Sequence, residues 1–514
     1  MQFPREAGIL LHPTSLPGPF GIGEIGEQAF RFVDFMASCG VRLWQILPLG
    51  PTGYGNSPYQ TLSAFAGNHL LISLEELVHE GLLRQEHLTP LTTLSADRVD
   101  FGRLIPLKEE ALKQAYNTFR SKPFPRLQTE FETFCHHQAS WLEDYAFFRA
   151  LKNHFGGVIW TEWPDELIHR KPQALRRWQD ELAPAIDAIR FEQFLFFKQW
   201  SSVKAHANGK HIKIIGDIPI FIAHDSADVW ANQELFFLDN SGNPSLVAGV
   251  PPDYFSATGQ RWGNPLYRWE VMKQQDYQWW IERFRATFQL VDIVRLDHFR
   301  GFEAYWEVPA HEETAINGRW VPGPGAPFFE AVEQKLGKLP IIAEDLGVIT
   351  PEVVALRERF EYPGMRVLQF AFGTDEGSKF FLPHNYPRNC VVYTGTHDND
   401  TCVGWFTSES WNHTTLSPEA IRRERERALQ YMGSTGEEIH WDFIRLAFAS
   451  VANTAITPLQ DVLGLGSEAR MNLPGRPDGN WEWRFRAAML TDGIQQRLGE
   501  FIDLYQRDGR YYAP

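Results

Sequence analysis

The chain has 514 residues, of which 43% are hydrophobic and 14% are aromatic, and its formal net charge is −15. A chain of this length can bury a large core, and a barrel of alternating strands and helices often forms one domain of about 250 residues or more. The acidic balance argues against a nucleic-acid-binding surface, which normally carries a basic patch, and it favours a neutral ligand.

Short apolar runs bounded by turn residues alternate with helical patterns along the chain, which is typical of strand–helix units around a parallel sheet. Eight runs of this kind are present: Ala7–His12, Val41–Leu49, His211–Ile220, Val291–Asp297, Pro340–Asp345, Met365–Phe372, Cys390–Asp398 and Thr454–Asp461. Eight parallel strands close a (β/α)8 barrel. The sequence therefore predicts an α/β fold in which residues 1–514 form one TIM barrel domain with large, mostly helical insertions between barrel strands.

The largest insertion is expected between the second and third runs, which are separated by roughly 160 residues, far more than an ordinary βα connection. Stretches such as Ile105–Phe119 and Trp141–Phe155 have helical spacing. We interpret residues 68–190 as an inserted, mostly helical subdomain. Phe191–Ala207 would then be the barrel helix that Gly209 ends before the third strand.

Residues 249–267 (GVPPDYFSATGQRWGNPLY) are rich in Gly, Pro and aromatic residues and follow neither the helical nor the strand period. This composition predicts a long ordered loop, and loops of this kind often act as lids or binding edges of an active site. The alternative is a structural crossover that packs on the body through its Tyr, Phe and Trp side chains.

Polar or ionisable residues close several of the apolar runs, namely His12, Asp217, Asp297, Glu344, Asp398 and Asp461. The carboxyl ends of parallel barrel strands meet on one rim, where barrel enzymes carry their chemistry. Any one of these residues could simply mark the place where an apolar pattern stops. Six of them on separate strands favour a functional site instead.

Two neighbouring runs supply carboxyl groups with different expected properties. Side chains alternate along a strand, so Arg295 and Asp297 share a face, and the guanidinium favours the ionised form of Asp297, as a nucleophile requires. Glu344 follows an apolar run next to other carboxylates, so its pKa should be raised, as suits a general acid/base. Two carboxyl groups on adjacent strand ends could lie near the ~5–5.5 Å separation of retaining glycosidases.

The seventh run ends in a dense polar cluster, Thr396–Asp400 (THDND), which could bind sugar hydroxyls and stabilise positive charge in a transition state. A metal site that includes His298 is the alternative, although the spacing matches no compact ligand motif. We expect no metal and no cofactor. The segment Gly21–Gly26 (GIGEIG) matches G-x-G-x-x-G, but it lies nine residues beyond His12 across a Pro-rich loop, so the tight turn of a dinucleotide site is missing.

Cellular location can also be addressed from the sequence. The cysteines are far apart and form no C-x-x-C pair: Cys39, Cys135, Cys390 and Cys402. The start MQFPRE lacks a basic segment followed by an apolar run, and no stretch reaches the ~20 apolar residues of a membrane span. We expect a cytoplasmic protein that binds neither membrane nor nucleic acid and works as a monomer.

These motifs resemble those of the amylomaltases, the 4-α-glucanotransferases also called disproportionating enzymes, which are grouped with the α-amylase clan of retaining barrel enzymes. The similarity covers nearly the whole chain and rests on the following segments: GILLHPTSLPG with GIGEIG, LPLGPTGYGNSPYQ, GDIPIF, PPDYFSATGQRWGNPLY, RLDHFRGF, AEDLG, GTHDNDT and RMNLPG. The long segment PPDYFSATGQRWGNPLY is far more specific than any isolated acid.

The resemblance implies a nucleophile at Asp297, an acid/base at Glu344 and a transition-state stabiliser at Asp398. It also implies contacts to the sugar before the scissile bond from Arg295, His397 and Asp217, with Tyr59 as its stacking platform. Groups that shape the acceptor side would be Gln260, Trp262 and Phe370. Donors and acceptors would be maltooligosaccharides, glucose and α-1,4-glucans.

Two other functions remain open at this point. An α-amylase or α-glucosidase type of hydrolase would use the same carboxylates, but it would raise the number of reducing ends from maltotriose. A catalytically silent glucan-binding protein would also explain the aromatic residues, although three acids at strand ends argue against it.

Overall fold

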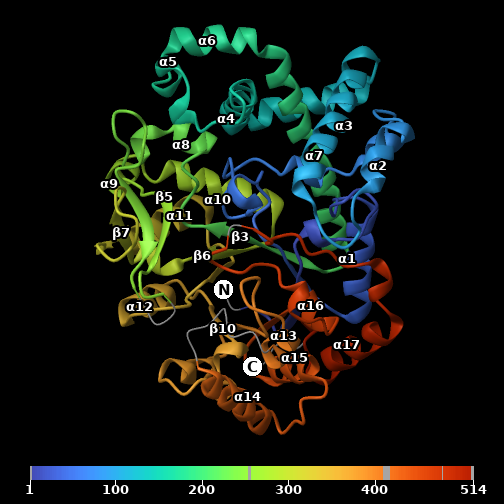
Figure 1. Cartoon of the computed structure of the whole chain (residues 1–514), viewed down its shortest axis with the longest axis vertical. Coiled ribbons are helices and arrows are strands. Elements are labelled where there is room, and N and C mark those ends of the chain that lie inside the picture. Colours follow the sequence, from blue (N-terminus) through green and yellow to red (C-terminus); the bar gives the residue numbers. More distant parts are fainter. Residues whose placement is uncertain (1–2, 253–255, 409–416, 477, 511–514) are drawn as a thin grey trace.

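The computed structural model describes residues 3–252, 256–408, 417–476 and 478–510, and a closed barrel lies at its centre (Figure 1). Within the described residues the barrel has eight parallel strands in the order β1-β12-β11-β10-β9-β6-β3-β2. They are β1 (Glu6–Leu10), β2 (Leu43–Gln45), β3 (Lys213–Pro219), β6 (Ile293–Asp297), β9 (Ile341–Ala343), β10 (Gly364–Val367), β11 (Cys390–Tyr393) and β12 (Thr454–Pro458). Each strand lies within or overlaps one predicted run, so the predicted barrel is confirmed.

The strands are short and almost entirely buried, as expected for a sheet covered by helices on its outer side. Several predicted runs extend beyond the strand itself. Glu344 lies one residue after β9, and Asp398 lies five residues after β11. Glu344 and Asp398 therefore lie in the connecting loops, where the backbone is free of the ladder and can aim a side chain, whereas Asp217 and Asp297 lie within their strands.

A second, smaller sheet stands beside the barrel rim and is antiparallel, in the order β5-β4-β7-β8. Its strands are β4 (Leu246–Val250), β5 (Gln260–Pro265), β7 (Ala304–Pro309) and β8 (Arg319–Pro322). The interpretation of residues 249–267 as one irregular loop is wrong in part, because the segment includes β5 and the end of β4. Pairing with β4 holds this Gly- and Pro-containing stretch in an extended conformation, although its sequence shows little strand periodicity. Residues 253–255 of the segment lie outside the described residues.

Helices surround the barrel. Those before β3 are α1 (Glu27–Cys39), α2 (Leu74–His79), α3 (Phe101–Ser121), α4 (Pro125–His154), α5 (Asp165–Ile168), α6 (Pro172–Glu181) and α7 (Ala183–Gly209). Between β3 and β11 lie α8 (Ala227–Ala231), α9 (Trp269–Gln274), α10 (Gln278–Leu290), α11 (Gly325–Leu336) and α12 (Pro351–Arg359). The remaining helices are α13 (Cys402–Thr407), α14 (Pro418–Met432), α15 (Ile439–Ala449), α16 (Leu459–Val462) and α17 (Asp492–Leu504).

Residues 68–190 contain α2 to α6, and Figure 1 shows α4, α5 and α6 gathered at one end of the molecule, above the barrel strands. The predicted barrel helix 191–207 is the larger part of α7, which ends at Gly209 but begins at Ala183. One continuous helix therefore joins this helical layer to the barrel, and α4 and α7 pack extensively on each other. The boundary of the subdomain near residue 190 stays a prediction.

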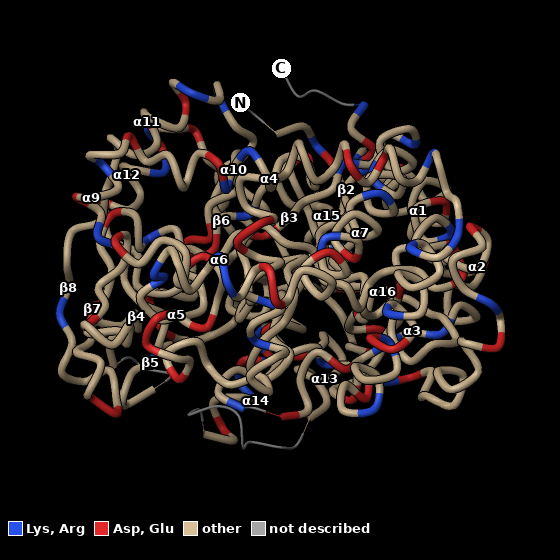
Figure 2. Tube along the Cα trace, turned by 90° about the horizontal axis from the view of Figure 1, so that it is seen from above, with Lys and Arg blue, Asp and Glu red and all other residues tan. Residues whose placement is uncertain are grey.

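Basic and acidic residues are interspersed along the chain in the view from above (Figure 2). In the described part of the chain, no helix combines the length and the apolar character that crossing a bilayer requires.

Two arginines close the end of the barrel at which β1 and β12 begin. The guanidinium of Arg507 is fully buried and donates only to backbone oxygens and one serine hydroxyl in residues 447–453. Arg5 donates to three carbonyls of the same stretch and to Tyr505. These hydrogen bonds give partners to carbonyls at the end of α15 and in the turn before β12.

Candidate active site

A buried arginine joins two carboxylates on adjacent strands. Asp217 of β3 lies directly opposite Arg295 of β6, and Arg295 Nη1 is 2.9 and 2.8 Å from the two Asp217 oxygens. The same nitrogen is 2.8 Å from Asp297 Oδ1, so Arg295 and Asp297 do share a face of β6, as predicted. Burial disfavours the charged guanidinium, but Asp217 and Asp297 outweigh it and hold the pKa of Arg295 well above its usual value. A permanent cation therefore lies beside Asp297.

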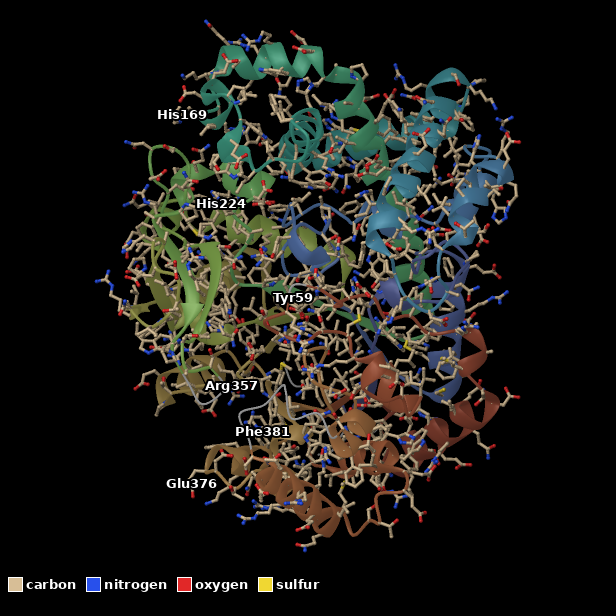
Figure 3. All side chains as sticks on the ribbon, viewed as in Figure 1. Tyr59, His169, His224, Arg357, Glu376 and Phe381 are labelled. Atoms are coloured by element: carbon tan, nitrogen blue, oxygen red, sulfur yellow. The ribbon has the colours of Figure 1, made fainter. Side chains whose placement is uncertain are left out.

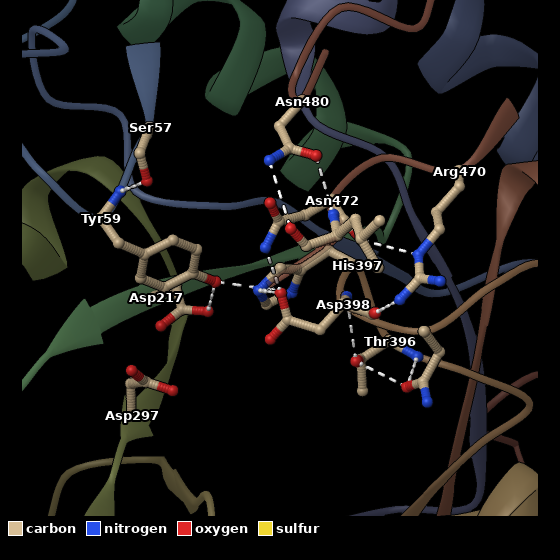
Figure 4. A network of polar contacts seen from close by, with 12 residues as sticks. Ser57, Tyr59, Asp217, Asp297, Thr396, His397, Asp398, Arg470, Asn472 and Asn480 are labelled. Carbon is tan, nitrogen blue, oxygen red and sulfur yellow. Dashed lines mark hydrogen bonds and ion pairs between the residues drawn. The ribbon is translucent and has the colours of Figure 1, made fainter. Parts of the chain in front are cut away.

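Tyr59 and His397 stack on each other on the side of Asp217. Their ring centroids are 5.0 Å apart at an interplanar angle of 18°, and Tyr59 donates a 3.0 Å hydrogen bond from its hydroxyl to Asp217 Oδ2 (Figure 4). Burial lowers the pKa of His397, so its imidazole is neutral near pH 7. The tilted indole of Trp481 lies 6.1 Å from the Tyr59 ring and 6.0 Å from that of His397. Together they form an aromatic wall next to the carboxylates.

Glu344 is buried just beyond β9 and is held by two backbone amides. His298 N donates to its Oε2 at 2.7 Å, and Leu346 N donates to its Oε1 at 2.8 Å. Burial raises the pKa of Glu344 and the charge of Asp297 raises it further, while Arg295 and the two amides oppose them only partly. Glu344 therefore retains a proton at pH values where an ordinary glutamate is ionised, in the direction expected from the sequence.

Asp398 is the most exposed of the three acids, with a side chain 47% accessible to solvent. Asn472 Nδ2 donates to its Oδ1 at 2.6 Å, and Arg470 Nη2 donates to its backbone oxygen at 2.6 Å (Figure 4). Its backbone amide donates to Thr396 Oγ1 at 3.3 Å. The carboxylate is thus fixed in direction while one side of it faces the solvent.

Gln260 and Trp262 lie on β5, an edge strand of the small sheet. Trp262 Nε1 donates to Gln260 Oε1 at 3.2 Å, and the Trp262 ring meets His298 edge to face at 4.8 Å. Because the backbone amide of His298 donates to Glu344, the indole of Trp262 is linked to the proposed acid/base through a single intervening residue, His298. Phe370 is 37% exposed after β10, and its ring contacts that of Phe381, which is labelled in Figure 3, with ring centroids 5.4 Å apart.

Comparison with known proteins decides the family. Residues 11–491 match a family model described as 4-alpha-glucanotransferase. The chain belongs to this family.

Relatives in the 4-alpha-glucanotransferase family cover essentially the whole chain. The 4-alpha-glucanotransferase of Synechocystis is 52% identical over 98% of both chains, and that of Thermus thermophilus is 50% identical over 99% of this chain and all of its own. A solved amylomaltase from Streptococcus agalactiae, in complex with acarbose, is 38% identical. It superposes with a TM-score of 0.92 over 98% of this chain and 99% of its own. The predicted resemblance and the TIM barrel are both confirmed.

Of the other strand-end residues predicted for the site, two lie behind it. A cavity next to the Asp398 loop is lined by His12, His397, Asp400 and Gln460, and burial lowers the pKa of His12 to about 3. Asp461 of α16 is buried against the start of α13, where it accepts from Thr394 Oγ1 at 2.6 Å and from Cys402 N at 2.7 Å. Asp461 therefore supports the backbone after Asp398 rather than facing the rim.

A metal is the alternative that the sequence left open for His298 and the Asp398 cluster. Within the described residues, no group of three or more His, Cys, Asp or Glu side chains is placed to hold a metal ion. His298 itself is buried, burial lowers its pKa to about 4, and its ring packs on Trp262. The geometry gives the metal alternative no support.

Sequence reasoning missed Asn472 and Arg470 as members of the site. Both lie in RMNLPG, a segment that contributed to the family resemblance without a role for any of its residues. Asn472 could have been noticed as a single side-chain amide in a segment that has neither helical nor strand periodicity, but its contact with Asp398 spans 74 positions in the sequence. That contact depends on β11 and β12 pairing side by side and has no local signal.

Proposed function

We propose that this 4-α-glucanotransferase moves glucosyl or maltooligosaccharyl segments from an α-1,4-glucan to the 4-hydroxyl of another by a retaining double displacement. Asp297 is the nucleophile, Glu344 the acid/base and Asp398 the transition-state stabiliser. The observation that carries these roles is the contrast between Asp297, at 2.8 Å from a buried guanidinium, and Glu344, whose pKa is raised by burial. One group is suited to attack and the other to deliver a proton.

In the first step Asp297 attacks the anomeric carbon while Glu344 protonates the glycosidic oxygen that leaves. The product is a covalent β-glycosyl-enzyme and a shortened glucan. In the second step the carboxylate of Glu344 takes the proton of an acceptor 4-hydroxyl, whose oxygen displaces Asp297. Two inversions restore the α configuration.

Substrate binding is proposed on both sides of the scissile bond. Tyr59, Asp217, Arg295 and His397 hold the sugar that Asp297 attacks, because they form one hydrogen-bonded wall beside it. Gln260, Trp262 and Phe370 shape the acceptor side. The similar amylomaltase from Streptococcus agalactiae was solved in complex with acarbose, which is consistent with a maltooligosaccharide-like ligand.

Transfer rather than hydrolysis requires that sugar reach the glycosyl-enzyme more readily than water does. Trp262 packs against His298 beside Glu344, so its indole covers the side from which an acceptor must approach. We expect Trp262→Ala to raise the share of hydrolysis by about 10-fold, since a displaced apolar ring admits water. Free glucose and total reducing ends from maltotriose measure that share, and an unchanged ratio would show that Trp262 has no such role.

The direct test is to incubate the pure protein with maltotriose and to follow chain lengths, free glucose and total reducing ends. We expect a ladder of longer maltodextrins with glucose at constant reducing ends. A steady rise of reducing ends without a ladder would identify a hydrolase and contradict the proposal.

We further propose that the protein acts as a monomer in the cytoplasm. The proposed catalytic and sugar-binding residues all come from one chain, and all four cysteines are free thiols, as in a reducing compartment. Light scattering at the concentration of the assay tests the first statement, and fractionation of cells tests the second.

A further inference from the structure

Arg300 is a buried arginine close to the proposed acid/base, and it pairs with none of the three proposed catalytic carboxylates. It belongs to the short 3-10 helix η7 (Phe299–Phe302) that follows β6, and its side chain is 8% exposed. The nearest carboxylate oxygen, on Glu303, is 4.0 Å away, at the limit of an ion pair. Burial lowers the pKa of Arg300, as for a cation that lacks a close counter-ion. Retaining such a side chain costs stability unless its donors are used.

The guanidinium of Arg300 donates its hydrogen bonds to backbone carbonyls. Nη1 donates to the carbonyl of Val348, and Nε donates to the carbonyl of Ala304 at 3.4 Å. Val348 lies in the loop Asp345–Thr350 that connects Glu344 to α12. The same loop provides the amide of Leu346, which donates to Glu344 Oε1 at 2.8 Å. Arg300 thus fastens the loop two residues beyond the amide that orients the acid/base.

The small sheet holds the guanidinium from its other side. Trp320 of β8 covers it, with the guanidinium carbon 3.7 Å from the ring centroid. Trp320 pairs with Trp306 across β7 and β8, and the two rings meet at 5.2 Å. The indole is nevertheless 38% exposed, so it is not a core residue in the ordinary sense. A flat cation under an aromatic ring, with its donors on carbonyls, is a rigid clamp.

We infer that Arg300, braced by Trp320, is a positioning residue for Glu344, which it holds at the glycosidic oxygen by fixing the loop Asp345–Thr350. The inference rests on the proposed role of Glu344. It adds a function for β8, which otherwise only extends the small sheet, and links that sheet to the proton-transfer step through three consecutive contacts.

Two glycosyl donors distinguish a role in positioning Glu344 from a general loss of active-site structure. The first step with maltotriose needs a proton from Glu344, whereas fluoride leaves from α-maltotriosyl fluoride with little help from an acid. We expect Arg300→Lys, which keeps charge but loses the planar fork, to lower kcat on maltotriose by about 10- to 100-fold. The first-turnover burst of fluoride should stay within about threefold of the wild type, and KM for maltotriose should hardly change.

Trp320→Leu tests the brace without removing the buried cation, so it keeps the inference testable if Arg300→Lys fails to fold. We expect the same split between donors with a smaller loss on maltotriose, about 3- to 10-fold. The matched control is Arg170→Lys. Arg170 stacks on Trp230 at 4.1 Å and pairs with Asp144, but none of the three contacts the acid/base loop. This variant should be unchanged on both donors.

Glu344→Gln serves as the reference, because it should show the largest split of all if Glu344 is the acid. No split in Glu344→Gln would overturn the proposed function itself. With the split present in Glu344→Gln, equal losses on both donors, or no loss at all, in folded Arg300→Lys and Trp320→Leu would overturn the positioning role.

Discussion

The two ends of the barrel use a buried arginine in opposite ways. At the rim, Arg295 faces Asp217 and Asp297, and their charges raise its pKa despite burial. At the other end, Arg507 is equally buried but donates to backbone carbonyls, and burial lowers its pKa well below the usual value. The first arginine pairs with two carboxylates at the rim, and the second fixes the path of the chain. A side chain's partners, rather than its burial, therefore determine what it does.

Removing the proposed nucleophile should have the largest effect on activity and almost none on folding. Asp297→Asn keeps the shape of the site but cannot form the glycosyl-enzyme, so we expect kcat on maltotriose to fall at least about 10⁴-fold. Calorimetric binding of maltotriose should persist. A variant that kept substantial turnover would remove Asp297 from the mechanism, and one that lost binding as well would give it a different role.

Exchanging each buried arginine for methionine tests the comparison directly. Arg295→Met leaves Asp217 buried without its cation, and we expect kcat to fall by about 10²- to 10³-fold. Arg507→Met removes the hydrogen-bond donor of several buried carbonyls. We expect the free energy of unfolding to fall by about 2–4 kcal/mol, with kcat within about threefold of the wild type. Urea unfolding and maltotriose kinetics on both variants measure the two outcomes. Equal losses of activity in both would show that the two ends are not functionally distinct.

The sequence predicted the parts of the molecule that have local signals. Each barrel strand lies within or overlaps a largely apolar run, and the alternation along β6 placed Arg295 beside Asp297. Strand β5 was not predicted, because a half-exposed QRWGNP stretch has neither period and is extended only by pairing with β4. The contacts of Asn472 and Arg300 were missed for a related reason, since both join irregular loops that are brought together by the pairing of neighbouring barrel strands.

Asn472 sharpens the picture of the rim, because it is a neutral group that directs a charged one. Asn472→Ala removes a 2.6 Å hydrogen bond to Asp398, and we expect kcat/KM to fall by about 10- to 30-fold. Asn472→Asp should be worse than Asn472→Ala, because it places a second carboxylate against Asp398. If both substitutions behaved alike, the hydrogen bond would not be what orients Asp398.

The smallest expected effect concerns stability and pH. Burial raises the pKa of Glu344 in the folded state, whereas an unfolded glutamate titrates near pH 4.3. The folded protein then binds more protons between these two values, so the contribution of Glu344 to stability is lost as pH rises through the folded pKa. Glu344→Gln has no such loss. We expect its melting temperature to exceed that of the wild type by about 2–4 °C at pH 9 and by less at pH 5. A constant difference across this range would contradict the raised pKa.

Closure of the barrel by its first and last strands has a consequence for synthesis on the ribosome. Glu6 of β1 pairs with Thr454 of β12, so one edge of β1 waits for a partner roughly 450 residues later in the chain. At about 5–20 residues per second, that edge stays without its partner for on the order of 20–90 s. An unpaired, largely apolar strand edge is a template for aggregation during that interval. The nascent chain must therefore either bury β1 temporarily against elements already made, such as α1 and β2, or depend on a chaperone until translation reaches β12.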